Sequence, residues 1–278
     1  MKIFELLQRI KPKEGPVLGV EYEIEGRHLP RHVKNFAVHQ EGSLRSIDGH
    51  PAREYVTVSP VNLATTIDHL QVLINTLRTD PECEPIFSNR TSVHVHLNVS
   101  DLEVEEWFTL LFIWTVYEES MIHYCGEARK GNLFCLSSRD AEASLFILEE
   151  FAVKQNIYLF EDNVRYAACN LAATPKYGSL EFRCMRGTLD KDVLIPWFTT
   201  IENLYLLAKK FGTPENFINT FMADPEQLTY NLFGEQHFIY NYPNWREDSL
   251  EKARRLSLIL DLCDWDKFNF RDEPIYDI

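Results

Sequence analysis

Three short segments of this chain alternate apolar and polar residues without a break, and this alternation restricts the fold more than any other feature. The segments are VEYEIE at 20–25, SVHVHLN at 92–98 and LEFRC at 180–184. Successive side chains of a β-strand point to opposite faces, so each segment has one apolar face and one polar face. The apolar faces need cover from another layer, which predicts a sheet packed on helices.

The polar face of the first segment carries three carboxylates, Glu21, Glu23 and Glu25. Side chains two positions apart on a strand lie roughly 7 Å from each other. At an effective dielectric of about 20, two like charges at that distance cost about 2 kcal/mol, and far less when water surrounds them. The segment is therefore either a solvated acidic edge of the sheet or one part of a cation site.

The other two segments favour the cation site, because their polar faces also consist of groups that bind ions or exchange protons. These groups are Ser92, His94, His96 and Asn98 in the second segment, and Glu181 and Arg183 in the third. Two histidines two positions apart, taken alone, are more often structural than metal-binding. Three strands whose polar faces all carry ion-binding groups have one common explanation. They predict a single sheet whose polar face gathers ligands for divalent cations: Glu21, Glu23, His94 and Glu181.

The types of ligand indicate the ion. Carboxylates with few imidazoles suit Mg²⁺ or Mn²⁺, whereas a closed zinc site uses cysteine and histidine. Mg²⁺ held by carboxylates commonly also binds phosphate oxygens, for which arginine is a well-matched partner. Arg183 lies on the metal-binding face. Arg165 is a second candidate for the phosphate partner, but it could equally well be an ordinary surface arginine. The glycine-rich nucleotide motifs GxxxxGK[ST] and GxGxxG do not occur in the sequence, so a nucleotide would bind on the sheet itself.

Helical periodicity of apolar residues predicts helices between and after the strands. The predicted helices cover 62–77, 104–122, 140–153, 193–211, 213–228 and 246–263, and short strands are expected within 35–46 and 53–60. The segment 104–122 is apolar on almost every side, which indicates a buried central helix. Gly212 is expected to end the long helix before it, and Pro196 to start or kink that helix.

The strands lie early in the chain and the helices increasingly late. We therefore expect a single α+β domain over 1–278, with a mostly antiparallel sheet that packs on helices and has a concave metal- and nucleotide-binding face. Residues 15–190 carry the motifs, and 191–278 form a mainly helical C-terminal part.

Composition excludes some classes of function. The formal net charge is −14 and the sequence pI is about 5.1, so bulk binding to nucleic acid or to an anionic membrane surface is not expected. The opening residues are too charged for a signal peptide, and no apolar run is long enough to span a membrane. The six cysteines form no CxxC pair and are interpreted as reduced thiols, which predicts a cytoplasmic protein.

Six motifs in this order resemble the amidoligase family of ATP-dependent carboxylate–amine ligases. They are GVEYEIEG (19–26), EGSLR (41–45), REYVTVSP (53–60), SVHVHLN (92–98), RYAACNL (165–171) and SLEFRCMRGT (179–188). Each motif alone is weak, and the order and pairing of the motifs are what make the resemblance specific. The resemblance implies the catalytic fold of glutamine synthetase and glutamate–cysteine ligase. The turn at Gly42 departs from it mildly, because Glu41 stands where an aspartate is expected.

The resemblance also implies roles for particular residues. Glu21 and Glu23 would hold two different Mg²⁺ or Mn²⁺ ions, with Glu54, His94 and Glu181 as further metal ligands. His96 and Asn98 would face ATP, and Arg183 would hold the phosphoryl group during its transfer. Arg165 and Asn170 would line the substrate side, Arg165 as a second catalytic arginine. Glu25 is read either as a ligand or as a hydrogen-bonded carboxylate at the rim, and Arg129 and Asn132 either as site residues or as parts of a plain loop.

The implied reaction joins a carboxylate to an amine through an acyl phosphate, giving an amide or isopeptide bond. Two other functions stay open on the sequence alone: a metal-dependent amide hydrolase, and a non-catalytic relative that binds a nucleotide or a peptide. The expected partners are small-molecule or peptide carboxylates and amines, and the chain could form an oligomer. The amine and carboxylate stay open among glutamate-like amino acids, peptide termini, polyamines and amine-bearing modified nucleobases.

Overall fold

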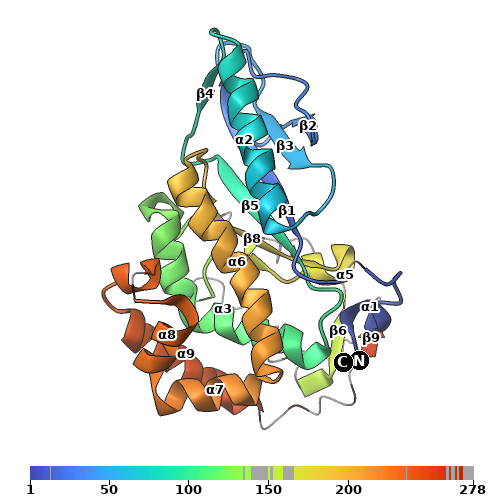
Figure 1. Ribbon diagram of the computed structural model, residues 1–278, viewed down its shortest axis with the longest axis vertical. Helices are drawn as coiled ribbons and strands as arrows, with labels where there is room; N and C mark the ends of the chain where they lie inside the picture. Colours follow the sequence, from blue (N-terminus) through green and yellow to red (C-terminus); the bar gives the residue numbers. More distant parts are fainter. Residues whose placement is uncertain are drawn as a thin grey trace.

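The protein has an α+β fold in which a mostly antiparallel sheet packs on helices (Figure 1). The computed structural model describes residues 1–12, 14–133, 135–138, 150, 153–158, 166–235, 237–260, 263, 267 and 269–271. Within these ranges, seven strands form one sheet with the order β2-β3-β1-β5-β8-β7, and β4 pairs with the far end of β1.

The sheet strands come from widely separated parts of the chain. They are β1 (Leu18–Arg27), β2 (Phe36–Gln40), β3 (Arg53–Thr57), β4 (Glu84–Ile86), β5 (Ser92–Asn98), β7 (Cys169–Asn170) and β8 (Ser179–Arg186). All neighbouring pairs in this sheet are antiparallel. A separate parallel pair is formed by β6 (Asn156–Tyr158) and β9 (Asn269–Arg271). The three alternating segments of the sequence are β1, β5 and β8, which lie next to one another at the centre of the large sheet.

The apolar faces of these three strands form the back of the sheet and are fully covered, as the alternation predicts. The predicted back residues are each at most 1% exposed: Val20, Tyr22, Val93, Val95, Leu97, Leu180 and Phe182. Burial of one such side chain stabilises the fold by about 1.5–3 kcal/mol. Three helices provide the cover, because α2 (Leu63–Thr79) packs on β1, α6 (Lys191–Phe211) on β5 and α3 (Val104–Cys125) on β8.

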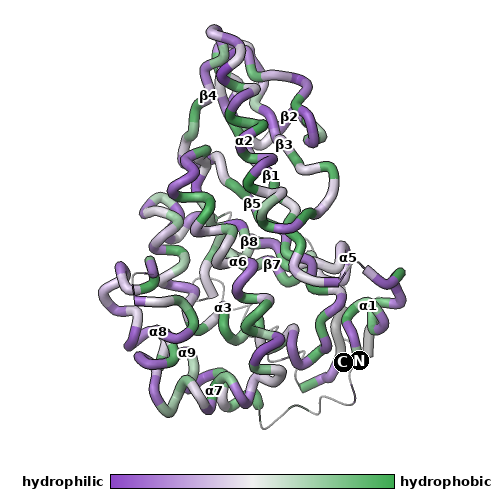
Figure 2. Tube along the Cα trace, viewed as in Figure 1, coloured by the Kyte–Doolittle hydropathy of each residue, from purple (hydrophilic) through white to green (hydrophobic). Residues whose placement is uncertain are grey.

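Helix α3 is the centre of the helical layer, as its all-round apolar sequence predicts. It contacts α6, α7 (Pro214–Ala223), α9 (Trp245–Leu260) and the 3-10 turn η3 (Phe238–Asn241). Figure 2 shows α3 as a largely apolar segment among these neighbours. Helices α7, α8 (Pro225–Phe233) and α9 gather at the end of the molecule opposite β4 (Figure 1).

The other short helical elements are α1 (Ile3–Leu6), η1 (Glu127–Arg129) and α5 (Ala173–Tyr177). Side-chain caps begin several helices: the Asn62 side chain accepts from the Thr65 N–H before α2, and Asp190 caps α6 in the same manner. Gly212 ends α6 with φ of +72°, as predicted, and Pro196 lies inside that helix, which excludes only the first of its two predicted roles, that of starting the helix.

The predicted helices at 62–77, 104–122, 193–211, 213–228 and 246–263 are confirmed, with the fourth divided into α7 and α8 at Asp224. Most of the predicted helix at 140–153 lies outside the described residues, and so does Arg165. In the part of the chain that the structure describes, no helix combines the length and apolar character needed to cross a bilayer.

Candidate active site

The front of the sheet carries a cleft of about 870 Å³. The six polar residues predicted to converge all line it: Glu21, Glu23, His94, His96, Glu181 and Arg183. Glu54 on β3, Asn98 on β5 and Asn170 on β7 line the same cleft. The polar side chains of the cleft therefore come from five neighbouring strands, which hold them on a rigid base.

Strand register brings acidic and imidazole groups opposite each other. Glu21 on β1 is the ladder partner of His94 on β5. His96, two residues further along β5, is the partner of Glu181 on β8. Side chains of directly opposed residues have Cβ atoms about 4.5–5.5 Å apart, so each carboxylate lies beside an imidazole. The residues are far apart in sequence, and only the pairing of the strands makes them neighbours.

Glu21, His96 and Glu181 form the candidate metal centre. One ligand atom from each of the three lies within 4.8 Å of the others. His96 Nε2 is 3.3 Å from Glu21 Oε1 and 3.9 Å from Glu181 Oε1. The family resemblance places His96 at the nucleotide, whereas the structure places it among the groups that could ligate the metal.

His94 lies against the same two carboxylates. Its Nδ1 atom is 3.3 Å from Glu21 Oε2 and 3.5 Å from Glu181 Oε1, and its Nε2 atom is 2.7 Å from Ser92 Oγ. The Ser92 hydroxyl donates its single proton to Glu23, so its oxygen is left to accept from His94 Nε2–H. Nδ1 is thus the nitrogen that faces the two carboxylates: when protonated it donates to Glu21, and a bound cation would take the place of that proton.

The electrostatics of the centre favour negatively charged carboxylates. Burial alone would raise the pKa of Glu21, but hydrogen bonds and charge from His94 and His96 hold that pKa far below its usual range. Burial opposes ionisation of Glu181 too, and the charges of His94, Arg183 and His96 lower its pKa overall. Both groups are therefore ionised at neutral pH and able to ligate a cation.

The opposite effect occurs at Glu54, at the edge of the centre. Burial, followed by repulsion from Glu21, Glu41 and Glu23, raises the pKa of Glu54 to about 7. The pKa of His96 is also raised, because hydrogen bonding to Glu21 and the nearby carboxylate charges outweigh the burial that would lower it. The cleft therefore holds an excess of negative charge at this end, which protons or bound cations neutralise.

Arg183 and Asn170 complete the surroundings of Glu181. The guanidinium of Arg183 contacts Glu181 Oε1, and the side-chain amide of Asn170 donates to Glu181 Oε2 at 2.7 Å. The Arg183 side chain is 16% exposed and the Glu181 side chain 7%. Glu181 thus has both oxygens engaged, and Arg183 lies at the surface of the cleft, where it can reach an anionic ligand.

The other end of the cleft is less acidic and more apolar. Val17, Pro60 and Ala173 line it, together with Tyr177, whose ring lies edge-on to His96 at 6.1 Å and is 60% exposed. The amide nitrogen of Asn98 is buried without a hydrogen-bond partner. This end offers a flat apolar wall and an unsatisfied donor to a ligand.

Three residues that the sequence left open as site residues do not line the cleft. Glu25 is 1% exposed and accepts a hydrogen bond from the Arg45 N–H, so its hydrogen-bonded reading is the one that fits the structure. Asn132 bonds the carbonyls of Asn89 and Ala128, away from the cleft. Arg129 is buried behind the cleft rather than in its lining.

Sequence reasoning missed three contributors. Ser92 lies on the polar face, as the alternation predicts, but the alternation does not indicate that its hydroxyl bridges Glu23 and His94. Lys176 and Tyr177 line the cleft from α5, although no spacing rule connects a short helix to the strands. Their only signal was proximity to the SLEFRC strand, because Gly178 turns the chain directly from α5 into β8.

The chain has a distant structural neighbour, a crystal structure described as that of a novel glutamine synthase homolog. The two chains are 12% identical, the match covers 88% of this chain and 67% of the neighbour, and the TM-score is 0.35. No protein-family model and no curated protein matches this chain. A likeness this weak carries no argument about function, so the resemblance to amidoligases still rests on the motifs alone.

Proposed function

We propose that the protein is an ATP- and Mg²⁺-dependent ligase that joins a carboxylate to an amine through an acyl phosphate, on a sheet of the glutamine synthetase type. The observation that carries this proposal is the convergence of Glu21, His96 and Glu181 within 4.8 Å of one another, with Arg183 in contact with Glu181. Metal ligands and a phosphate-binding arginine at one carboxylate are the parts that phosphoryl transfer requires.

The residues present fit a divalent cation. Glu21 and Glu181 supply ionised oxygens, and His94 and His96 supply nitrogens within 3.9 Å of these carboxylates. Glu23 and Glu54, which are direct partners across the β1–β3 ladder, offer a second acidic position. When bound, Mg²⁺ or Mn²⁺ supplies charge neutralisation and a fixed orientation for phosphate oxygens.

The residues also fit a nucleotide. In the proposed arrangement the phosphates lie against the metal centre and Arg183, and the base extends toward Tyr177. The unpartnered amide nitrogen of Asn98 would then find an acceptor on the nucleotide. A cleft of about 870 Å³ has the size of sites that enclose a large small-molecule ligand.

The chain's own residues then have defined tasks. A carboxylate oxygen of the first substrate attacks the γ-phosphorus, ADP departs, and Arg183 stabilises the charge on the transferring group. The amine of the second substrate attacks the acyl carbon, phosphate leaves, and a carboxylate at the acidic end accepts the proton that the amine loses.

The test is a nucleotide-binding measurement followed by a turnover screen. Calorimetry with a non-hydrolysable ATP analogue is expected to show binding with Mg²⁺ or Mn²⁺ and none in EDTA. Glu181→Gln is expected to weaken that binding at least tenfold, whereas the matched control Glu226→Gln changes an exposed carboxylate on α8 and leaves it unchanged. ADP release is then measured over a matrix of carboxylates and amines.

Each alternative has its own outcome in these measurements, to which an assay of amide cleavage with metal and without ATP is added. Equal nucleotide affinity in EDTA would contradict the metal centre. Metal-dependent amide cleavage without ATP would identify a hydrolase. Tight Mg²⁺-dependent binding with no ADP release for any substrate pair would indicate a relative that binds without catalysis.

A further inference from the structure

The strand that carries Arg183 is irregular at Arg183 itself. The ladder between β5 and β8 passes from Val95–Phe182 to Val93–Met185, so one residue of β5, His94, faces two residues of β8. Those two residues are Arg183 and Cys184. A β-bulge of this kind bends the strand and re-aims a side chain, and bulges recur beside active sites.

The bulge leaves backbone groups that the regular ladder does not satisfy. Successive carbonyls of a regular strand point toward opposite edges, so one side chain does not normally reach two of them. Here a single guanidinium does: Arg129 Nε donates to Cys184 O at 3.0 Å, and an Arg129 terminal nitrogen donates to Arg183 O at 2.9 Å. Both carbonyls of the bulge are thus held by one residue.

A buried arginine such as Arg129 is an unusual residue for a purely structural role. It is 2% exposed, and among the residues that the structure describes no carboxylate forms an ion pair with it. Burying a guanidinium costs free energy unless all its donors are used in good geometry. Its own backbone is fixed too, because Arg129 O accepts from the Cys135 thiol and Arg129 N–H donates to Gly126 O.

We propose that Arg129 is a positioning residue for Arg183, which holds the bulge in the shape that directs the Arg183 side chain into the cleft. This inference rests on the proposed function, because it assigns Arg129 to the arginine that binds the transferring phosphoryl group. The planar fork of arginine bonds two carbonyls at once, and lysine keeps the charge without that fork. Arg129→Lys is therefore the decisive change.

The first measurement needs no knowledge of the reaction. In arginine-labelled protein, the Nε–Hε signal of Arg183 is assigned by its disappearance in Arg183→Lys. We expect Arg129→Lys to shift or broaden this signal. The matched control is Arg186→Met, which removes an arginine that also bonds two carbonyls, those of Tyr124 and Cys125 at the end of α3, and leaves the Arg183 signal in place. An Arg183 signal that Arg129→Lys does not move overturns the inference.

The second measurement uses turnover. We expect Arg129→Lys to reduce turnover about 10–100-fold while nucleotide affinity changes less than about threefold, because small displacements of a charge-stabilising group have effects of that size. The double variant Arg129→Lys/Arg183→Lys is expected to be no slower than Arg183→Lys alone, since the first residue acts through the second. Multiplicative losses in the double variant would overturn the inference.

The outcomes separate this inference from the proposed function. Absence of metal-dependent nucleotide binding in the wild-type protein would contradict the proposed function. The Arg183 signal would still decide whether Arg129 positions Arg183. An Arg129→Lys chain that does not fold would assign Arg129 to stability and overturn the positioning role. Normal turnover with a lowered melting temperature would have the same meaning.

Discussion

Asn170 donates a 2.7 Å hydrogen bond from its side-chain amide to Glu181 Oε2, its direct partner across the β7–β8 ladder. The other end of the amide is fixed as well, because Asn170 Oδ1 accepts from the Ala172 N–H at 3.0 Å. Asn170 is 6% exposed, so its amide cannot turn away without leaving buried groups unpaired. The pair thus holds one oxygen of Glu181 and leaves the other toward Arg183 and the histidines.

Asn170→Ala is expected to weaken binding of Mn²⁺ about 10–100-fold, since loss of a residue that orients a metal ligand has effects of this size. Titration calorimetry with Mn²⁺ measures it. The matched control is Asn132→Ala, whose side chain bonds two carbonyls outside the cleft. Unchanged Mn²⁺ affinity in Asn170→Ala would show that Glu181 needs no orienting partner or does not bind metal.

Arg183→Lys is expected to reduce ligase turnover about 10²–10³-fold, the scale seen when one preorganised charge-stabilising group is lost. The free energy of unfolding is expected to fall by about 1 kcal/mol at most, because lysine retains the charge next to Glu181. Arg27→Lys is the control, since Arg27 pairs with Asp48 and Glu84 at an exposed site. Near-normal turnover together with a clearly lowered melting temperature would make Arg183 a structural residue.

Gly26→Ala is expected to reduce the free energy of unfolding by about 1–3 kcal/mol more than Gly15→Ala does. Both glycines have positive φ, +143° and +95°, so both variants carry backbone strain. A Cβ atom at Gly26 would lie 2.1 Å from the backbone oxygen of Glu84, whereas one at Gly15 would meet nothing within 4 Å. The difference between the two variants, measured by chemical denaturation, therefore isolates the close approach of β1 and β4. Equal losses would contradict that approach.

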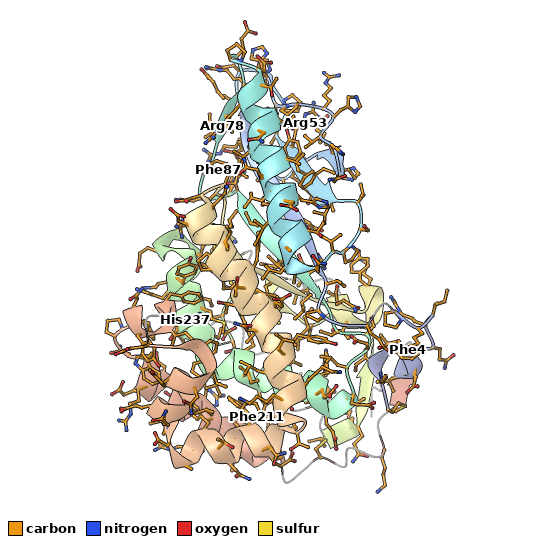
Figure 3. The ribbon with its side chains drawn as sticks, viewed as in Figure 1. Phe4, Arg53, Arg78, Phe87, Phe211 and His237 are labelled. Atoms are coloured by element: carbon orange, nitrogen blue, oxygen red, sulfur yellow. The ribbon has the colours of Figure 1, made fainter. Side chains whose placement is uncertain are left out.

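His237 is expected to make the protein less stable in acid. The ring, labelled in Figure 3, lies against Phe238 with centroids 4.0 Å apart, and its Nδ1 accepts from the Ile239 N–H. Its other nitrogen lies 3.0 Å from Thr200 Oγ1, whose proton goes to the Pro196 carbonyl, so Nε2 is the donor. Both nitrogens are thus used by the neutral ring, and burial lowers the pKa of His237 to about 4.

The direction of the pH effect follows from that lowered pKa. Between about pH 4 and 6.5 the unfolded chain binds a proton at His237 and the folded chain does not, so stability falls as the pH falls through this window. At pH 5 the expected loss is about 1–2 kcal/mol after allowance for partial solvent exposure. His237→Asn keeps an acceptor in the position of Nδ1 for the Ile239 N–H and does not titrate. The stability difference between wild type and variant is expected to stay constant above pH 7 and to change below pH 6.5. A difference that stays constant down to pH 5 would contradict the assignment.

Much of the fold could be predicted because its signals are local. The two-residue period of VEYEIE, SVHVHLN and LEFRC follows from the geometry of an extended backbone, so the buried faces of β1, β5 and β8 were readable directly. The same holds for α3, whose apolar residues on every side required a buried position. Glu21, His94 and Glu181 could be predicted as neighbours because each lies on the polar face of its strand, and the three strands were expected to form one sheet.

Tertiary structure alone decided which of these groups meet. Glu25 has the same spacing as Glu21 and Glu23, yet the pairing of β4 with the end of β1 buries it against the Arg45 N–H. His96 joins the candidate metal centre because the register pairs it with Glu181. Arg129 reaches the carbonyl of Arg183 from a residue 54 positions earlier. A period is a property of consecutive residues, whereas register, bulges and burial depend on contacts between distant segments, which no local pattern encodes.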